Sequence, residues 1–447
     1  MTELDDQHRS AQAVDPAPRP DTDPEAAAAV AADPALLPGT ASIQRRTLIV
    51  LVISQVIGTI GVGVAPSIGV LLAGEVTDNE AWAGLARTAS TLGAALAGIP
   101  LGTLAAHRGR RFALTSGWWT AATGSALLVP AAQWSLMVPM FIGLLMIGVG
   151  SAVALQARFA ATDLAPRQRK ARALSLVVWV GTLGSVLGPN LGLPGKAISA
   201  GTGLSVYAAA FLIAATTLGL AGLIVFIWLR PDPLLALMDR TSSDAAPPPV
   251  TSARTGRLRR IFEELKVNRR ARYAVLAILT AQIVMVSLMT ITPVHLSRQG
   301  DTVTIIGLTI SLHIAGMYAL APVVGTITDR FGPRATVGVG IIILLASFLI
   351  GGLRPSDTTA IVASLILLGV GWSFVNVAGS ALFSAVVSDE ARASAQGGVD
   401  AMSNLCGATA AFAAGPLLVL TSFSTLAVLA GVLMFPLMVA TVRAEAR

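Results

Sequence analysis

Two pairs of soft side chains stand four residues apart in apolar stretches of the sequence. Met285 and Met289 form one pair, and His313 and Met317 form the other. Residues at i and i+4 share one face of a helix, so each pair could present two ligand atoms to the same space. Thioether and imidazole groups suit Cu(I). These four residues predict a site for a soft metal ion such as copper, as a substrate. No resident cofactor is expected.

Two other interpretations of these residues stay open. Methionine fills gaps in apolar helices, and Met434 and Met438 repeat the spacing where no site is expected. A single histidine in a membrane helix usually makes a hydrogen bond to a neighbouring helix. His313 could instead relay a proton, because imidazole titrates near neutral pH.

The elements that must carry these side chains are membrane helices. Of the 447 residues, 54% are hydrophobic and 12% are charged, against about 25% charged in a soluble protein. This composition excludes a soluble enzyme, a disordered protein and a nucleic-acid-binding domain. Since a spanning helix needs about 20 apolar residues, the chain predicts an all-α membrane protein with twelve transmembrane helices. We expect these at 47–73, 81–105, 112–131, 135–159, 171–193, 205–230, 272–297, 303–327, 335–353, 357–387, 394–420 and 423–443.

The seventh and eighth of these helices carry the soft pairs. They run in opposite directions, and each pair lies about midway along its helix. All four side chains should therefore lie at similar depth, near the middle of the bilayer.

Lysine and arginine residues gather in every second loop, beginning with the loop after the second helix. By the positive-inside rule, both termini and the central loop should be cytoplasmic, in a multi-pass protein of the cytoplasmic (plasma) membrane. The expected organisation is an acidic disordered tail, a six-helix half, a linker and a second six-helix half, at 1–44, 45–230, 231–270 and 271–447. Residues 258–270 could lie on the membrane as a basic amphipathic helix or simply tether the halves. We expect a monomer whose partners are the bilayer and a small-molecule or metal-ion substrate, and no nucleic acid.

Polar side chains within the expected helices are further candidates for a pore or for ion coupling. Arg87 either reaches toward the headgroups or attracts an anionic substrate. Arg158 is expected to reach lipid phosphate or to pair with Asp163. The candidates for pore or coupling residues are Gln55, Arg87, Gln282 and Asp400.

An internal repeat relates the two halves. The segment GTLAAHRGRR at 102–111 follows the second helix, and GTITDRFGPR at 325–334 follows the eighth, 223 residues later. Two like halves joined by a long loop predict a pseudo-two-fold axis along the membrane normal and a substrate path between the halves.

The repeated segment resembles the loop motif of the major facilitator superfamily. The second copy matches it at Gly325, Asp329, Arg330, Gly332 and Arg334. The first copy keeps Gly102, Gly109 and Arg110, but Ala106 and His107 replace the usual Asp and Arg. The resemblance implies a gating role, in which Asp329 latches the cytoplasmic side through a helix N-terminus or an arginine. Because Ala106 has no charge, the latch in the first half should be weaker.

A glycine-rich stretch in the fifth helix is similar to another motif of that superfamily. It contains Gly184, Gly188 and Pro189. The Gly-Pro step removes a backbone hydrogen bond and permits a kink. Close helix packing through small residues is an equally good interpretation.

The soft pairs, M-x-x-x-M on the seventh helix and H-x-x-x-M on the eighth, resemble the CcoA-like copper-importer branch of the superfamily. That resemblance implies that Met285, Met289, His313 and Met317 are copper ligands. The chain lacks the G-x-x-x-x-G-K-[ST] nucleotide-binding motif. We therefore expect no enzyme but a secondary transporter that works by alternating access and imports copper. The alternative is proton-coupled efflux of drugs or small organic metabolites, and a membrane sensor or scaffold is a third, weaker reading.

Overall fold

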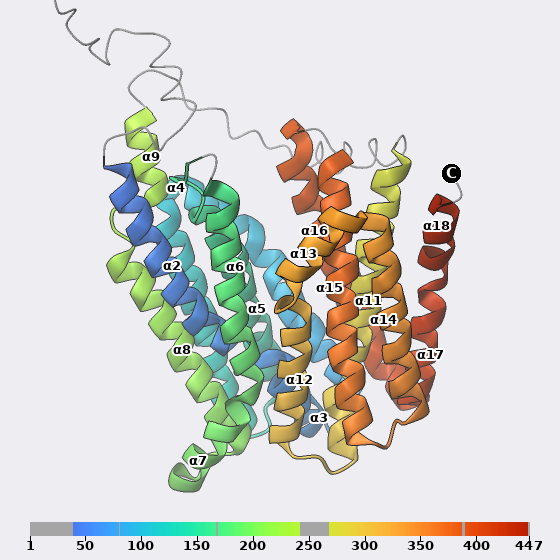
Figure 1. The fold of residues 1–447 in the computed structure, drawn as a ribbon. Helices are drawn as coiled ribbons and strands as arrows, with labels where there is room; N and C mark the ends of the chain where they lie inside the picture. The colour runs from blue at the N-terminus through green and yellow to red at the C-terminus, as the bar shows by residue number, and fades with distance from the viewer. Residues whose placement is uncertain (1–38, 80, 167–168, 242–267, 387–388, 446–447) are drawn as a thin grey trace, which may run out of the picture.

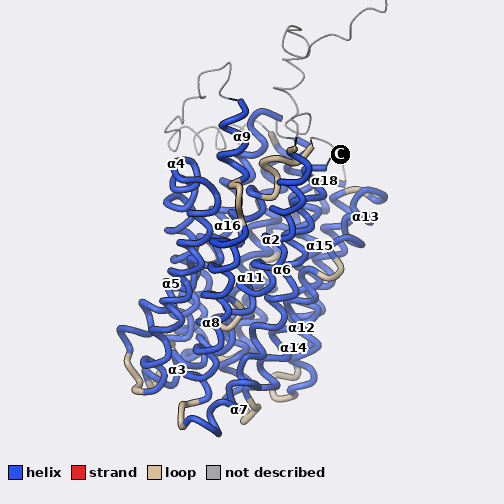
Figure 2. The backbone as a smooth tube through the Cα atoms, turned by 90° about the vertical axis from the view of Figure 1, so that its left-hand side faces the viewer, coloured by secondary structure: helices blue, strands red, loops and turns tan. Residues whose placement is uncertain are grey.

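The computed structural model describes residues 39–79, 81–166, 169–241, 268–386 and 389–445. The described residues form helices joined by short loops, and none of them lies in a strand (Figure 2). Most of the expected N-terminal tail and of the amphipathic segment at 258–270 lies outside the described residues.

The first half contains the helices that precede residue 242 (Figure 1). The first expected span is built from α2, a π-helical turn and α3, and the fifth from α6, a 3₁₀ turn and α7. The elements are α2 (Thr40–Val62), η2 (Ala65–Gly69), α3 (Val70–Thr77), α4 (Trp82–Gln133), α5 (Met137–Ala160), α6 (Lys170–Leu187), η4 (Gly188–Leu191), α7 (Gly192–Thr202), α8 (Val206–Trp228) and α9 (Pro233–Thr241).

The second half follows the central loop and repeats this pattern with small differences. Its eighth and twelfth spans are each divided in two, at Ala319–Leu320 and at Met434. The elements are α11 (Arg269–Arg298), α12 (Val303–Tyr318), α13 (Ala321–Phe331), α14 (Pro333–Leu353), α15 (Thr358–Val386), α16 (Asp389–Leu420), α17 (Phe423–Leu433) and α18 (Phe435–Glu445).

The predicted all-α membrane fold is confirmed. Ten helical stretches of the described residues are long and apolar enough to cross a membrane. The long element α4 raises this to as many as 11, as a pair of helices bent by 49°, and its backbone also leaves the helical conformation at Gly109, between the second and third expected helices. The twelve expected helices are therefore consistent with the structure.

The turns at Gly109 and Gly332 show that the sequence repeat is also a structural repeat. Both glycines have φ 86°, with ψ 168° at Gly109 and 153° at Gly332. A residue with a side chain rarely adopts this conformation, which explains a glycine at both positions. Each turn leads one helix directly into the next.

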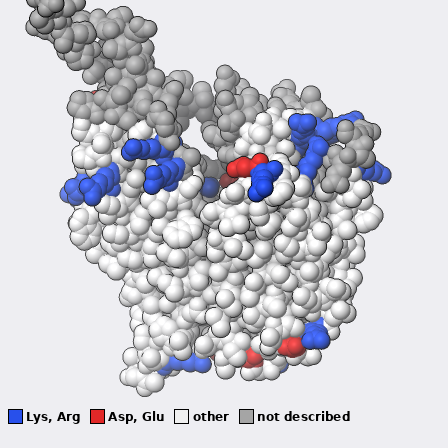
Figure 3. Space-filling view, in the orientation of Figure 1, with Lys and Arg blue, Asp and Glu red and all other residues white. Residues whose placement is uncertain are grey.

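Basic side chains gather at one end of the molecule, which we call the basic end (Figure 3). The chain enters its first helix at this end, and the turns at Gly109 and Gly332 also lie there (Figure 1). The described arginines of this end include Arg45, Arg46, Arg108, Arg110, Arg111, Arg269, Arg270, Arg330 and Arg334.

The two halves are in close contact toward the opposite end. A Cβ on Gly84 would clash with the Ala411 carbonyl, and one on Gly415 would clash with the Ala81 carbonyl, so α4 and α16 touch backbone to backbone. Asn190 donates a hydrogen bond to Ser311 Oγ across the halves at 2.6 Å. At the basic end the surface is hollowed between the halves (Figure 3). The molecule is thus closed at the opposite end and open at the basic end.

Candidate functional site

A cavity of about 250 Å³ lies between the two halves. Six spans contribute to its wall, four from the first half and two from the second. Its position between the halves, near the contact at the opposite end, is where an alternating-access protein would hold a substrate. Its lining residues are Val62, Gly63, Ala65, Pro66, Arg87, Ser90, Ile147, Gly148, Ser151, Ser185, Met285, Met289, Ile314, Met317 and Tyr318.

Arg87 on α4 is the charged residue of this wall, and no acidic residue lines it. Within the described chain, no hydrogen bond or ion pair satisfies its guanidinium. A cation in an apolar setting is costly unless it has a partner. The cavity is therefore a positively charged space with hydroxyl groups around it, from Ser90, Ser151, Ser185 and Tyr318.

Three of the four predicted soft ligands meet at this cavity. Met285 and Met289 reach it from α11, and Met317 reaches it from α12. All three are at most 7% exposed, so they present thioether and methylene surface to the cavity and are otherwise packed in the core. The sequence thus indicated which residues converge, while their role stays a prediction.

The fourth predicted ligand, His313, lies outside the cavity lining. Its side chain is fully buried, and Nδ1 lies 2.8 Å from the Leu365 carbonyl oxygen of α15. Its Nε2 atom has no hydrogen-bond partner in the described part of the chain. The backbone of α15 also packs tightly here, since a Cβ on Gly369 would clash with the His313 carbonyl. The imidazole therefore joins α12 to α15, as expected for a lone histidine in a membrane helix. Among the described residues, no three His, Cys, Asp or Glu side chains converge to hold a metal.

The two glutamines proposed for the pore are placed within their own halves. Gln55 is buried and donates from Nε2 to the Ala154 carbonyl at 3.2 Å, which joins α2 to α5. Gln282 accepts a hydrogen bond from Trp372 Nε1 at 3.1 Å. The Trp372 ring in turn makes an edge contact with Tyr318 at 5.9 Å. Gln282 therefore supports the cavity wall through Trp372 and Tyr318.

The acidic candidate Asp400 pairs across the gap between the halves. Its Oδ2 atom lies 3.4 Å from Nη2 of Arg158 on α5. The expectation that Arg158 pairs with Asp163 or reaches lipid phosphate is not what the structure shows. Asp163 instead binds Arg110, and the sequence offered no means of choosing between the two carboxylates.

Arg110 and Asp163 form a nearly buried ion pair in the first copy of the loop motif. Their side chains are 15% and 11% exposed, and Nε lies 2.8 Å from Oδ2. Arg110 Nη1 also reaches Gln156 Oε1 at 3.5 Å. Burial raises the pKa of the Asp163 carboxyl above its usual range, and the Arg110 guanidinium opposes that shift. The pair holds the turn at Gly109 against the loop that follows α5.

Asp232 is a helix-capping residue that the sequence analysis did not single out. Its Oδ2 accepts a hydrogen bond at 2.7 Å from the backbone N–H of Arg111, at the start of the helix after Gly109. Its Oδ1 accepts from Leu234 and Leu235 at 3.0 and 3.2 Å, which caps α9. One carboxylate thus satisfies two helix N-termini, an arrangement that also suits their dipoles. The Asp-Pro step before an apolar run was the available signal for a helix start.

The second copy of the loop motif places Asp329 at the C-terminal end of α13. Asp329 is exposed at the end of α13, and no described residue pairs with it. The Arg330 guanidinium lies 5.5 Å from the centre of the Phe331 ring. Asp329 thus has no latch partner among the described residues, and its gating role stays a prediction.

The fifth span combines both interpretations of its Gly-Pro motif. A Cβ on Gly184 would clash with Thr59 and Val56 of α2, and Gly188 lies against Gly63. At Gly188 the α-helix gives way to a 3₁₀ turn that includes Pro189. Close packing against α2 and a break in the helix therefore occur at the same place.

The fold and this central cavity define a membrane transporter and not an enzyme. The family model described as Major Facilitator Superfamily matches residues 47–304 and 276–446. The chain belongs to the Major Facilitator Superfamily.

Two curated relatives cover most of the chain. It is 34% identical to the protein named "Uncharacterized MFS-type transporter YdeG" from Bacillus subtilis, over 88% of this chain and 90% of that protein. It is 27% identical to "Riboflavin transporter RfnT" from Brucella anthropi, over 86% of this chain and 92% of that protein. None of these comparisons supports the copper-importer branch in particular.

Solved structures share the fold. The nucleoside transporter NupG superposes with a TM-score of 0.66 at 17% identity, covering 89% of this chain and 98% of that one. A bacterial homologue of the lysosomal transporter Spinster, in an inward-facing conformation, gives 0.63 at 18% identity, covering 91% and 94%. At these identities the likeness establishes the fold alone.

Proposed function

We propose that the chain is a secondary transporter for a small organic molecule that carries an anionic group. The observation that carries this proposal is Arg87, a cation on the wall of the central cavity without an acidic partner among the lining residues. The proposed setting is the cytoplasmic membrane, with the basic end and both termini in the cytoplasm, on the strength of the positive-inside rule.

The chemistry of the wall favours an amphipathic anion. A carboxylate or phosphate on the substrate would make charge-assisted hydrogen bonds to the guanidinium and offset its loss of hydration. The hydroxyls of Ser151 and Tyr318 are available to polar groups, and the three methionines offer apolar, adaptable surface. A relative named as a riboflavin transporter supports an organic substrate.

Copper import is the second candidate, because three thioethers line one cavity. Two features favour the organic anion over it. The Arg87 guanidinium repels a cation at the same site, and His313 is not among the residues that line the cavity. Proton-coupled efflux would use the same cavity and differs in the direction of transport and in its coupling to protons. For that mechanism, Asp400 at the gap between the halves is the candidate for the group that binds the proton.

A binding screen on the purified protein tests the proposal. Pairs of organic acids and their neutral amides are compared by thermal shift, since a ligand that binds the folded state raises its melting temperature. Some acids should stabilise the protein while their amides do not. Arg87→Gln should weaken binding about ten- to hundredfold, and Arg87→Lys should recover part of it. The control is Arg354→Gln, an exposed arginine in a loop between α14 and α15, which should leave binding unchanged.

A copper arm separates the two candidates. Cu(I) under reducing conditions is added to wild type and to the triple variant Met285→Leu/Met289→Leu/Met317→Leu, with Met434→Leu as the control. We expect no copper binding that depends on the three methionines, and retained anion binding in the triple variant. Stoichiometric Cu(I) binding that only the triple variant loses, with no acid bound by wild type, would overturn the organic-anion proposal in favour of copper.

A further inference from the structure

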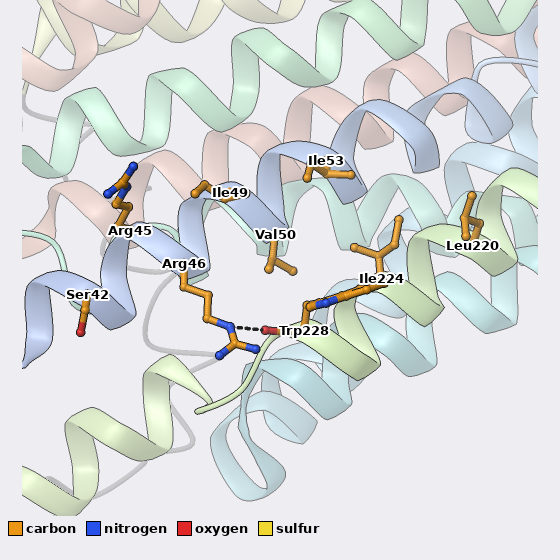
Figure 4. A pocket seen from close by; sticks show the side chains of 9 residues that line it. All are labelled: Ser42, Arg45, Arg46, Ile49, Val50, Ile53, Leu220, Ile224 and Trp228. Atoms are coloured by element: carbon orange, nitrogen blue, oxygen red, sulfur yellow. Dashed lines mark hydrogen bonds between the residues drawn. The ribbon is translucent and has the colours of Figure 1, made fainter.

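A second hollow, separate from the central cavity, lies on the outer surface of the first half. It is a groove of about 740 Å³ between α2 and α8 (Figure 4). That volume lies within the range of ligand sites in proteins, which is about 300–1,000 Å³. The groove begins at the basic end and runs along the two helices toward the middle of the membrane.

The walls of the groove are apolar and face the surroundings of the protein. Ile49 and Ile53 of α2 are 50% and 44% exposed, and Leu220 of α8 is 47% exposed. Side chains with this exposure in a membrane span are in contact with lipid. A hydrocarbon chain is therefore the group that these walls would accept.

The rim of the groove at the basic end is cationic. Arg45 and Arg46 line it, and no acidic residue is among the described residues around it. Arg46 Nε donates a hydrogen bond at 3.1 Å to the Trp228 carbonyl oxygen, at the end of α8 (Figure 4). That bond holds the guanidinium over the groove and leaves its terminal nitrogens to other acceptors. Trp228 itself is 49% exposed, as tryptophans at a membrane interface are.

The second half differs from the first at the corresponding place. Tyr273 of α11 stands 224 residues after Ile49, and its hydroxyl lies 2.9 Å from Thr441 Oγ1 of α18. In the first half an isoleucine replaces the tyrosine, and the bond between the described residues of α2 and α8 is the one from Arg46 to the Trp228 carbonyl at the rim. A pair of arginines, Arg269 and Arg270, begins α11 at the position equivalent to Arg45 and Arg46. The arginine pair is thus repeated in the second half, where a side-chain hydrogen bond joins α11 to α18.

We propose that this groove binds one anionic phospholipid from the leaflet at the basic end. Its phosphate would accept hydrogen bonds from Arg45 and Arg46, and an acyl chain would lie along Ile49, Ile53 and Leu220. Basic pockets between membrane helices on the cytoplasmic side bind anionic headgroups by this chemistry. Two cations without a nearby acid select a net negative headgroup over a zwitterionic one. The proposal is independent of the substrate of the central cavity.

Native mass spectrometry of the full chain tests the proposal. The protein is released from detergent with equal amounts of phosphatidylglycerol and phosphatidylcholine that have the same acyl chains. Wild type should keep one phosphatidylglycerol in preference to phosphatidylcholine by about tenfold or more, at roughly fivefold for each arginine. Arg45→Gln/Arg46→Gln should bring the ratio near one. The matched control Arg269→Gln/Arg270→Gln should keep the preference.

A second variant tests the groove without changing its charge. Ile53→Trp fills the apolar channel at an exposed position, and should also lose the bound lipid while its melting temperature stays near that of wild type. Equal retention of phosphatidylglycerol by wild type and Arg45→Gln/Arg46→Gln would overturn the proposal. So would phosphatidylglycerol binding that appears only after the acidic residues 1–38 are deleted, because the chain's own N-terminal segment would then be the occupant.

Discussion

Arg158 of α5 and Asp400 of α16 form an ion pair of 3.4 Å that joins the two halves across the gap at the basic end. The side chains are 24% and 56% exposed, so water screens their attraction. Such a pair is worth about 0–1 kcal/mol. It is a weak tie, suited to forming and breaking as the halves move.

Removing this tie should shift the halves toward a wider opening at the basic end. In Asp400→Asn, spin labels on α6 and α15 at that end should show more of the longer distance that marks the wider opening. The population with the longer distance should rise by at most about fivefold, as expected for up to 1 kcal/mol. Double electron–electron resonance measures the change, with Cys406 replaced beforehand. Arg158→Gln/Asp400→Asn should resemble either single variant, because one broken pair cannot be broken twice. Additive effects of the two changes would show that the residues act separately.

The glycines of the two repeated turns should differ in their tolerance of a side chain. Gly109→Ala and Gly332→Ala both place alanine at φ 86°, with ψ 168° or 153°, a region essentially restricted to glycine, which costs about 1–3 kcal/mol. The Cβ on Gly109 would also clash with Asp232, whereas nothing lies within 4 Å of one on Gly332. The Gly109 variant should therefore lower the melting temperature clearly more than the Gly332 variant. Equal shifts would show that the Asp232 contact contributes nothing.

Arg110→Gln should destabilise the protein most at high pH. Burial raises the pKa of Asp163, so the ionised carboxylate costs stability above that pKa, and the cost disappears as pH falls through it. Without Arg110 the pKa rises further, and the unpaired carboxylate should cost about 2 kcal/mol at pH 8. The loss should shrink by pH 5, as measured by thermal or denaturant unfolding. In Arg110→Gln/Asp163→Asn the difference from wild type should no longer depend on pH in this way.

A side chain at Gly84 should separate the halves where they are closed. A Cβ there clashes with the Ala411 carbonyl, and main chain cannot move aside as a flexible side chain can. Gly84→Ala should therefore expose the cavity to the opposite end and reduce transport by about tenfold or more. Reaction of Ser151→Cys, on the cavity wall, with an impermeant maleimide added from that side reports the exposure. Gly219→Ala, with nothing within 4 Å of its Cβ, is the control and should behave as wild type.

The sequence was sufficient to predict that the chain forms membrane-spanning helices. An apolar run of spanning length has few other structures open to it in a membrane, because its backbone groups must be hydrogen-bonded internally. The shared helix face of Met285 and Met289 and the depth of Met317 were also enough to predict that these residues meet. The breaks within the first, eighth and twelfth spans were not expected. Pro66 stands in the π-helical turn, and Pro322 follows the break before α13, but a proline in a membrane helix does not by itself state whether the helix bends or divides.

The partners of polar side chains were the part that the sequence left open. Helical spacing puts His313 on the face of Met317, but a helix face about 100° wide touches two neighbours. The imidazole Nδ1 contacts the backbone of α15, whereas the Met317 thioether lines the cavity. Likewise, Asp163 and Asp400 were both available to an arginine, and the choice depends on distances between helices that are remote in sequence. The function of the cavity residues stays a prediction.

Asp232 also has a consequence for where the chain can be divided. Because it joins the N-terminus of α9 to that of the helix after Gly109, α9 travels with the first half. Separately expressed halves should therefore be cut after Thr241, because a cut at Arg230 would take Asp232 away from the first half and leave the helix after Gly109 without its cap.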